Sequence, residues 1–243
     1  YVDMDMARFF RGYQDMAKAK SYKEWLAGAE DMAWGPFAWN HVYADAKGNI
    51  AYWTTGHIAK RPYNRGYIAG KGWEKDSEWS GWVPFKENPH LVNPDKGYLV
   101  TANNKVQKPD YPYYIAGSYS DPSRASIISE QIEAKDSHGV EDMKRIQYNV
   151  SVYNARRMVP LILSDLEEEN GLWMKKAKEI LEEWKKQGYT ADVDSRGTCI
   201  YQVFMNKLTS QVFKDELGEE IMTGAGQAGG LSNGLKKKKN DPE

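Results

Sequence analysis

The chain has 243 residues, 41% of them hydrophobic, and a formal net charge of −1. This length fits one large or two modest domains, and the near-neutral charge gives no support for a nucleic-acid or anionic-membrane partner. No apolar run is long enough to cross a bilayer. The single cysteine, Cys199, excludes an internal disulfide and a cysteine-ligated zinc site, and its apolar neighbours predict a small buried residue.

The first residues predict helix from Asp5 to about Gly28. Apolar side chains recur there at helical spacing, namely Met6, Phe9, Phe10 and Tyr13. Ser21, with Glu24 three residues later, is a capping-box pattern and predicts that a second turn of helix begins at this point. Gly35-Pro36 then ends the helical part.

Residues 38–52 predict a β-hairpin, around which we expect the chain to be organised. Apolar and polar side chains alternate on both sides of Lys47-Gly48-Asn49, whose residues accept positive φ. Asn40 stands at the start of the first strand. A side-chain amide at a strand end can aim its NH2 group at a neighbouring site.

The next segment, residues 66–94, is rich in Gly and Pro and predicts an irregular loop. Its tryptophans, Trp73, Trp79 and Trp82, are expected to anchor that loop on a rigid scaffold. Gly97–Ala102 predicts a strand, which ends at Asn103-Asn104.

Helices are predicted from Asp121-Pro122 onward, because Asp can cap a helix and Pro fits its first position. Further helices are expected near 137–150, 173–184 and 198–217, with a bend at Pro160 and an end at Gly188. After Gly218 the sequence is rich in Gly and Lys and predicts a flexible tail. We therefore predict an α+β chain with a mixed aromatic-rich part (1–120), a helical part (121–218) and a tail (219–243).

Several motifs stand in an order that resembles one known family. They are Asn40-His41-Val42-Tyr43-Ala44-Asp45, Gly48-Asn49-Ile50, Trp79-Ser80-Gly81-Trp82-Val83-Pro84-Phe85, Thr101-Ala102-Asn103-Asn104 and Arg124-Ala125. Glu141-Asp142-Met143, Arg156-Arg157 and the region of Asp194-Ser195 continue the series in the helical part. The whole series resembles an internal segment of the large subunit of the penicillin acylase (penicillin amidase) family, and the resemblance covers roughly Met4 to Gly218. Each motif is weak alone, but their order makes chance a poor explanation.

The resemblance implies an N-terminal-nucleophile hydrolase scaffold, in which antiparallel strands are followed here by a helical region. Family members cleave linear amides, and the large chain begins with a Ser whose own α-amino group is the base. Such an amine titrates near neutrality. This chain begins with Tyr1, and Ser232-Asn233 follows Leu231 where the family has Gly. We therefore expect the nucleophile upstream, in a longer polypeptide, and expect this segment alone to be inactive.

The resemblance also implies roles for six residues. Asn40 would donate to the oxyanion, Arg61 would position groups at the site, and four residues would contact substrate: Trp79, Trp82, Asn103 and Asn104. Each has a structural alternative. Asn40 and the Asn103-Asn104 pair can bond local backbone, Arg61 can be a surface cation, and the two tryptophans can anchor their loop.

The expected ligand is a small-molecule acyl amide, either a β-lactam with its side chain or an acyl-homoserine lactone. Expected protein partners are the remaining chains of the same precursor or another copy of this segment. No cofactor is required. Some relatives bind a structural calcium, and Asp45 either lies near such an ion or supports the hairpin, but one carboxylate is not a calcium site, so no metal ligand is assigned. Relatives are commonly periplasmic or secreted. The alternative function is a non-catalytic ligand- or protein-binding module on the same scaffold.

Overall fold

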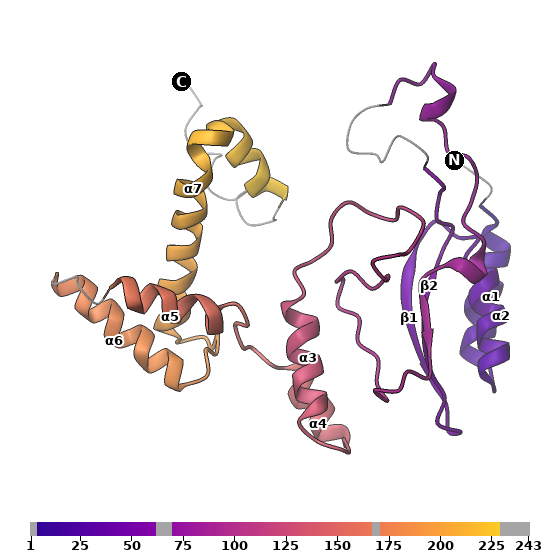
Figure 1. Ribbon diagram of the computed structural model, residues 1–243. Coiled ribbons are helices and arrows are strands. Elements are labelled where there is room, and N and C mark those ends of the chain that lie inside the picture. The colour runs from indigo at the N-terminus through magenta and orange to yellow at the C-terminus, as the bar shows by residue number, and fades with distance from the viewer. Residues whose placement is uncertain (1–3, 62–69, 167–170, 229–243) are drawn as a thin grey trace, which may run out of the picture. The chain divides into compact units, whose positions relative to one another are not determined.

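The computed structural model describes residues 4–61, 70–166 and 171–228, and the chain divides into two compact units, residues 1–143 and 144–243. The first unit contains a three-stranded antiparallel sheet and the second is helical (Figure 1). The α+β class expected from the sequence is therefore confirmed. Of the described helices, none combines the length and the apolar character that crossing a membrane requires.

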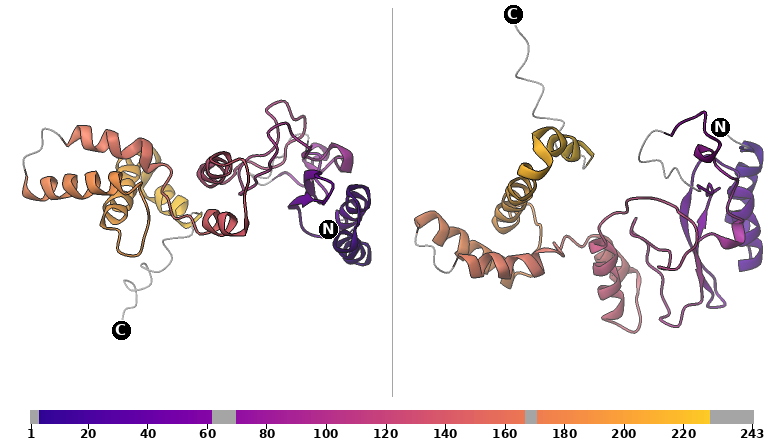
Figure 2. Two further views of the ribbon diagram at one scale, coloured as in Figure 1. Left: turned by 90° about the horizontal axis from the view of Figure 1, so that it is seen from below. Right: turned by 45° about the horizontal axis from the view of Figure 1, so that its top comes forward.

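Helices α1 (Met6–Lys18) and α2 (Tyr22–Met32) begin where the sequence predicted. The side chain of Asp5 accepts a hydrogen bond from the Arg8 backbone N–H at 2.9 Å, and the Ser21 hydroxyl accepts one from the Glu24 N–H at 3.3 Å. The two helices lie against each other on one side of the sheet (Figure 2). Their backbones touch at Gly12, where an added Cβ would lie 2.4 Å from the backbone nitrogen of Met32.

The predicted hairpin is confirmed by strands β1 (Trp39–Ala44) and β2 (Ile50–Thr55), which pair antiparallel. Gly48 has a φ of 88°, a conformation that glycine adopts without strain, and it lies in the turn between the strands. Strand β3 (His90–Val92) pairs with the other edge of β2.

The two faces of the sheet differ because side chains alternate along a strand. One face packs on the helices, with ring centroids 6.2 Å apart for Phe9 and Trp39 and 5.1 Å apart for Trp25 and Tyr43. The register Asn40↔Thr54 and Val42↔Tyr52 places these four residues on the opposite face.

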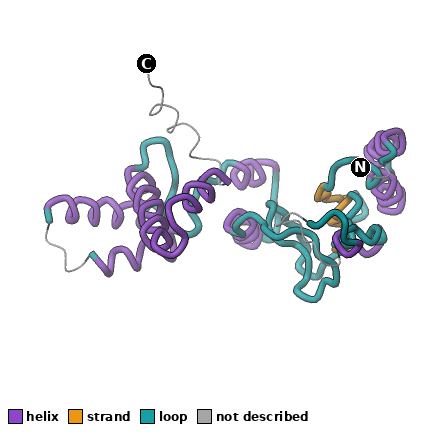
Figure 3. Tube along the Cα trace, turned by 90° about the horizontal axis from the view of Figure 1, so that it is seen from above, coloured by secondary structure: helices purple, strands orange, loops and turns teal. Residues whose placement is uncertain are grey.

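The predicted strand at Gly97–Ala102 is wrong: these residues belong to no strand in the part of the chain that the structure describes. Strand β3 occupies the edge of β2, and the carbonyl of Ala102 instead accepts a hydrogen bond from the Arg124 side chain at 2.7 Å. A strand needs a partner, and here a side chain takes that place. Much of this unit is loop (teal in Figure 3), with two short 3-10 helices at Lys75–Ser77 and Phe85–Glu87.

Five further helices complete the described chain: α3 (Ser123–Glu133), α4 (Val140–Gln147), α5 (Ala155–Asp165), α6 (Leu172–Lys186) and α7 (Arg196–Ala228). The core of the second unit comes from α5, α6, α7 and Tyr189. Its buried residues are Ala155, Val159, Ile162, Leu163, Leu181, Trp184, Tyr189 and Tyr201. Gly188, with a φ of 78°, follows the end of α6 as predicted.

Two local expectations for the last helix differ from the structure. Cys199 is exposed, because its neighbours Ile200 and Tyr201 are the residues that pack against the core. The predicted helix end near Leu217 agrees with the break at Gly218, whose φ is 73°, but a second helical stretch of α7 follows this kink and runs to Ala228, where the sequence suggested a linker. The rest of the predicted tail, 229–243, lies outside the described residues.

Candidate functional site

Asn40 lies exposed on β1, and two hydroxyl groups of β2 hold its side-chain oxygen. Tyr52 donates a hydrogen bond to Asn40 Oδ1 at 2.5 Å, and Thr54 Oγ1 lies 3.1 Å from the same oxygen. The two hydroxyl oxygens are themselves 2.7 Å apart. Three polar groups therefore converge, from residues that the hairpin register places on one face.

This triangle contains three contacts but only two hydroxyl protons, because Tyr52 and Thr54 carry one each. Two of the contacts can be hydrogen bonds at any moment, for example Thr54 to Tyr52 and Tyr52 to Asn40. Burial raises the pKa of Tyr52 to about 12, so its phenol stays protonated and remains a donor at neutral pH. Asn40 Oδ1 carries no proton, so it accepts a hydrogen bond from these hydroxyls and donates none.

The other end of the Asn40 amide is left as a hydrogen-bond donor. Among the described residues, Asn40 Nδ2 makes no hydrogen bond, and the residue is exposed. An amide with its oxygen occupied and its NH2 unbonded can donate to an oxygen that approaches from outside. This arrangement differs from the structural alternative, in which the Asn40 side chain bonds local backbone.

Asn88 supports the strand that carries Thr54. The Thr54 N–H donates to the carbonyl of Pro89 at 2.8 Å, but Pro89 has no N–H with which to return the bond. The buried side chain of Asn88 supplies that donor, with Nδ2 3.0 Å from the Thr54 carbonyl and 3.1 Å from the Gly56 carbonyl. The end of β2 is therefore held by one side-chain amide.

Arg61 lies in a second group, together with the two candidate tryptophans. Its guanidinium is 5.5 Å from the ring centre of Trp79 and 6.0 Å from that of Tyr114. Trp79 and Trp82 meet edge to face at 5.6 Å, and all three candidates line a pocket of about 210 Å³. In the described residues no hydrogen bond or ring contact joins Arg61 to Asn40. This pocket is cationic and aromatic, which suits a carboxylate or a planar apolar group.

Asn103 and Asn104 make local structural contacts. Asn103 has a φ of 62° and accepts a hydrogen bond from Arg124 at 2.8 Å, whereas Asn104 bonds the Ala102 N–H and the Lys105 carbonyl. Their side chains therefore hold the loop and the start of α3. Asn104 thus bonds local backbone, as the structural alternative had it, whereas Asn103 bonds the Arg124 side chain. Contact of either residue with a substrate stays a prediction.

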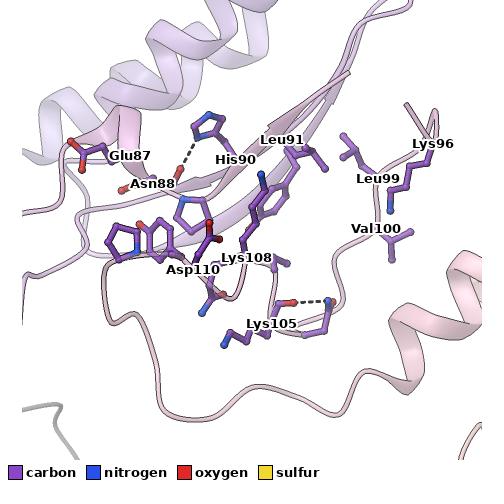
Figure 4. Close-up of a pocket in the computed structure, with 17 residues that line it drawn as sticks. Glu87, Asn88, His90, Leu91, Lys96, Leu99, Val100, Lys105, Lys108 and Asp110 are labelled. Carbon is purple, nitrogen blue, oxygen red and sulfur yellow. Dashed lines mark hydrogen bonds between the residues drawn. The ribbon is translucent and has the colours of Figure 1, made fainter. Parts of the chain in front are cut away.

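A larger pocket, of about 550 Å³, lies beside β3 and includes Tyr52 and Asn104 in its lining (Figure 4). Glu87 and Asp110 lie toward one end and Lys96 toward the other. Burial raises the pKa of Tyr111, another lining residue, to about 12, so this phenol is also protonated. The charged residues that line this larger pocket are of both signs, and Asn40 is not among its lining residues.

Asp45 does not fit a calcium ligand. Its carboxylate accepts four hydrogen bonds: from the backbone N–H groups of Lys47 and Asn49, from Asn49 Nδ2 and from the Tyr43 hydroxyl. These donors point their protons at the oxygens that a cation would need. In the described ranges, no group of three or more His, Cys, Asp or Glu residues could hold a metal ion. Asp45 therefore supports the hairpin turn.

The sequence did not single out Tyr52, Thr54 or Asn88. A signal for the first two was present, because pairing Ala44 with Ile50 across the turn places position 54 opposite Asn40. Asn88 gave no such signal. Its role depends on the pairing of β2 with the chain at Pro89, which only the folded structure shows.

The protein-family model described as penicillin amidase matches residues 2–242. Penicillin acylase 2 proenzyme from Pseudomonas sp. strain SE83 is 29% identical over 184 residues, which cover 74% of this chain and 23% of that protein. The acyl-homoserine lactone acylase QuiP of Pseudomonas aeruginosa is 27% identical over 231 residues, 90% of this chain and 27% of that protein. The chain thus spans about a quarter of the length of these relatives.

Among solved structures, a thermostable penicillin G acylase from Alcaligenes faecalis superposes with a TM-score of 0.69 at 24% sequence identity. The match covers 90% of this chain and 40% of that chain. This likeness shows that the two share a fold.

Proposed function

This chain belongs to the penicillin amidase family, and on that premise we propose that it forms part of a hydrolase that cleaves linear amides through a serine acyl-enzyme. The names of its relatives support an acyl amide as substrate, of the penicillin or acyl-homoserine lactone type. We place the nucleophilic Ser outside these 243 residues. The proposed reaction needs no cofactor.

In the proposed reaction, the Ser hydroxyl attacks the amide carbonyl while the α-amino group of the same residue takes the proton. The tetrahedral intermediate collapses as the protonated α-amino group gives this proton to the leaving amine nitrogen, and water then hydrolyses the acyl-enzyme to the acid and the free Ser. Negative charge builds on the carbonyl oxygen in both halves. A hydrogen-bond donor fixed in place before the reaction stabilises that charge without having to reorganise.

We assign this donor role to Asn40 Nδ2. The observation that supports it is the Asn40 amide itself, with Oδ1 held by two hydroxyls and Nδ2 unbonded within the described residues. We further propose that Arg61, Trp79 and Trp82 position the substrate, since they line one cationic and aromatic pocket. The remaining chains of the precursor would bring the nucleophile to Asn40.

The test is steady-state kinetics of the full-length protein on a chromogenic anilide of an acyl acid. Asn40→Asp keeps an acceptor toward Tyr52 and Thr54 but removes the NH2 donor, and Asn40→Ala removes the whole amide. We expect kcat to fall about 10²- to 10³-fold in both. Val42→Ala is the matched control, an exposed neighbour on the same strand and face, and should keep the parent kcat. Unchanged kcat in both Asn40 variants would refute the oxyanion role.

The same assay tests where the nucleophile lies. Residues 1–243 expressed alone should give no turnover, whether or not they associate with a second copy of themselves. Turnover by this segment would contradict the placement of the Ser outside it. If the full-length protein cleaves no amide, the proposed hydrolase function fails as a whole.

A further inference from the structure

We propose that the hydroxyl groups of Tyr52 and Thr54 are positioning groups that hold the Asn40 side chain with its NH2 facing the reacting carbonyl. The inference rests on the proposed function, because it explains how Asn40 is kept ready as a donor. Tyr52 and Thr54 do not touch the reacting atoms in this scheme. They act through Asn40, whose oxygen lies 2.5 Å from the Tyr52 hydroxyl and 3.1 Å from Thr54 Oγ1.

An Asn side chain has two orientations of nearly equal shape, related by a half-turn that exchanges oxygen and nitrogen. In the observed orientation both hydroxyl protons find acceptors, one on the partner hydroxyl and one on Asn40 Oδ1. In the flipped orientation the NH2 would face the hydroxyls and one hydroxyl proton would lose its acceptor. Tyr52 and Thr54 are only 6% and 8% exposed, so water cannot readily replace it. An unpaired buried donor disfavours the flipped form by roughly 5- to 150-fold.

The two hydroxyls are themselves fixed by the sheet. Both residues lie in the middle strand, β2, which pairs with β1 on one edge and β3 on the other. Thr54 is further held by its N–H bond to Pro89 and by the Asn88 amide on its carbonyl. The pKa of Tyr52, raised by burial to about 12, keeps its proton available over the working range of the enzyme. Rigid strand residues therefore set the orientation of an exposed side chain.

The experiment measures kcat and KM of the full-length protein for Tyr52→Phe, Thr54→Val and the combined variant. A freely flipping amide alone would lower kcat 2-fold, whereas complete loss of the donor would lower it about 10²- to 10³-fold. Because misplacement also weakens catalysis, we expect the combined variant to lose at least about 10-fold in kcat with little change in KM. Each single variant should lose less, because one hydroxyl remains. A combined variant that keeps the parent kcat, while the Asn40 variants lose theirs, would overturn the inference.

Matched controls remove the same groups from the opposite face of the hairpin. Tyr43→Phe deletes a phenol oxygen that bonds Asp45, and Thr55→Val deletes a hydroxyl that bonds the Trp39 carbonyl. Both should keep the parent kcat. Thr54→Ser retains a hydroxyl and should recover most of the kcat that Thr54→Val loses. If the serine variant is as slow as the valine variant at equal thermal stability, the hydroxyl does not act as proposed.

A double-mutant cycle with Asn40 separates positioning of the Asn40 amide from general damage to the fold. In an Asn40→Ala background there is no amide to orient, so adding Tyr52→Phe and Thr54→Val should lower kcat no further. A further loss of 10-fold or more would show that the hydroxyls act by another route, and would overturn the inference. Failure of the oxyanion role of Asn40 has a different signature, because Asn40→Ala alone would then leave kcat unchanged. Failure of the hydrolase function is distinct again, because the parent protein would then cleave no amide.

Discussion

Changing Asn88 to aspartate replaces its side-chain NH2 group by an oxygen, at the end of β2, and leaves the shape of the side chain almost unchanged. Asn88 is 1% exposed, and its NH2 group donates to the carbonyls of Thr54 and Gly56. Asn88→Asp replaces that double donor by a carboxylate oxygen. The two carbonyls lose their donor, and a negative charge is placed beside two partial negative charges in a buried site.

The size of the effect follows from these two bonds. A buried polar group left without its partner costs about 1–3 kcal/mol, so two carbonyls give about 2–6 kcal/mol. We expect a loss near the middle of this range at pH 7, about 4 kcal/mol, localised at the end of β2. Since Thr54 lies there, kcat should also fall.

The stability of the Asn88→Asp variant should depend on pH, and the pKa of the introduced carboxyl sets the direction of that dependence. Burial beside two carbonyls raises the folded-state pKa of the introduced carboxyl above its unfolded value of about 3.9. The folded state then binds the proton more tightly, so the variant gains stability as the pH falls through the folded pKa. In its protonated form the carboxyl can donate to one of the two carbonyls again. The deficit relative to the parent should therefore be smaller at pH 5 than at pH 7.

Hydrogen exchange of the full-length protein, read by mass spectrometry on peptides that contain residues 50–56, measures this local stability. Asn103→Asp is the control, because Asn103 accepts from Arg124 at 2.8 Å and a carboxylate accepts equally well. It should show no loss of protection. Parent-like protection in Asn88→Asp at pH 7, or a deficit that grows toward pH 5, would refute the account of how β2 ends.

Two further predictions concern the helices and the turn. Gly12→Ala would set a Cβ 2.4 Å from the Met32 backbone nitrogen. Hydrogen exchange should therefore show α1 and α2 destabilised by about 1–3 kcal/mol, despite a helix-propensity gain of about 1 kcal/mol. Gly139→Ala is the control, because the nearest atom to its added Cβ is 4.0 Å away; it should leave the protection of α1 and α2 unchanged, and equal protection of these helices in the two variants would contradict their close contact. Hydrogen bonds from the side chain and backbone of Asn49 hold the pKa of Asp45 at about 2, so protection of the turn should be complete above about pH 4 and fall as the pH drops toward 2. Asp45→Asn should abolish that pH dependence, and a turn that keeps it would show that another group titrates.

The starts of the first helices and the hairpin were predictable because their causes are local. Asp5 and Ser21 cap N–H groups three residues away, and a few turn residues fix the hairpin register. A strand, by contrast, needs an edge to pair with. The apolar sequence at Gly97–Ala102 did not predict that β3 would occupy the edge of β2. Likewise, the apolar neighbours of Cys199 did not show which side of its helix faces the core.

The family and the candidate oxyanion role of Asn40 were inferred from the sequence alone, because the order of motifs along a chain can be read without knowing how the chain packs. The tertiary structure decided what surrounds that residue. Pairing of the strands brought the Tyr52 and Thr54 hydroxyls to the Asn40 oxygen. Because Pro89 has no N–H, the Asn88 side chain is the group that donates a hydrogen bond to the Thr54 carbonyl. Sequence determines which groups are available and which local turns form. The partner of each buried polar group depends on strand pairing between distant residues, and only the folded chain fixes that pairing.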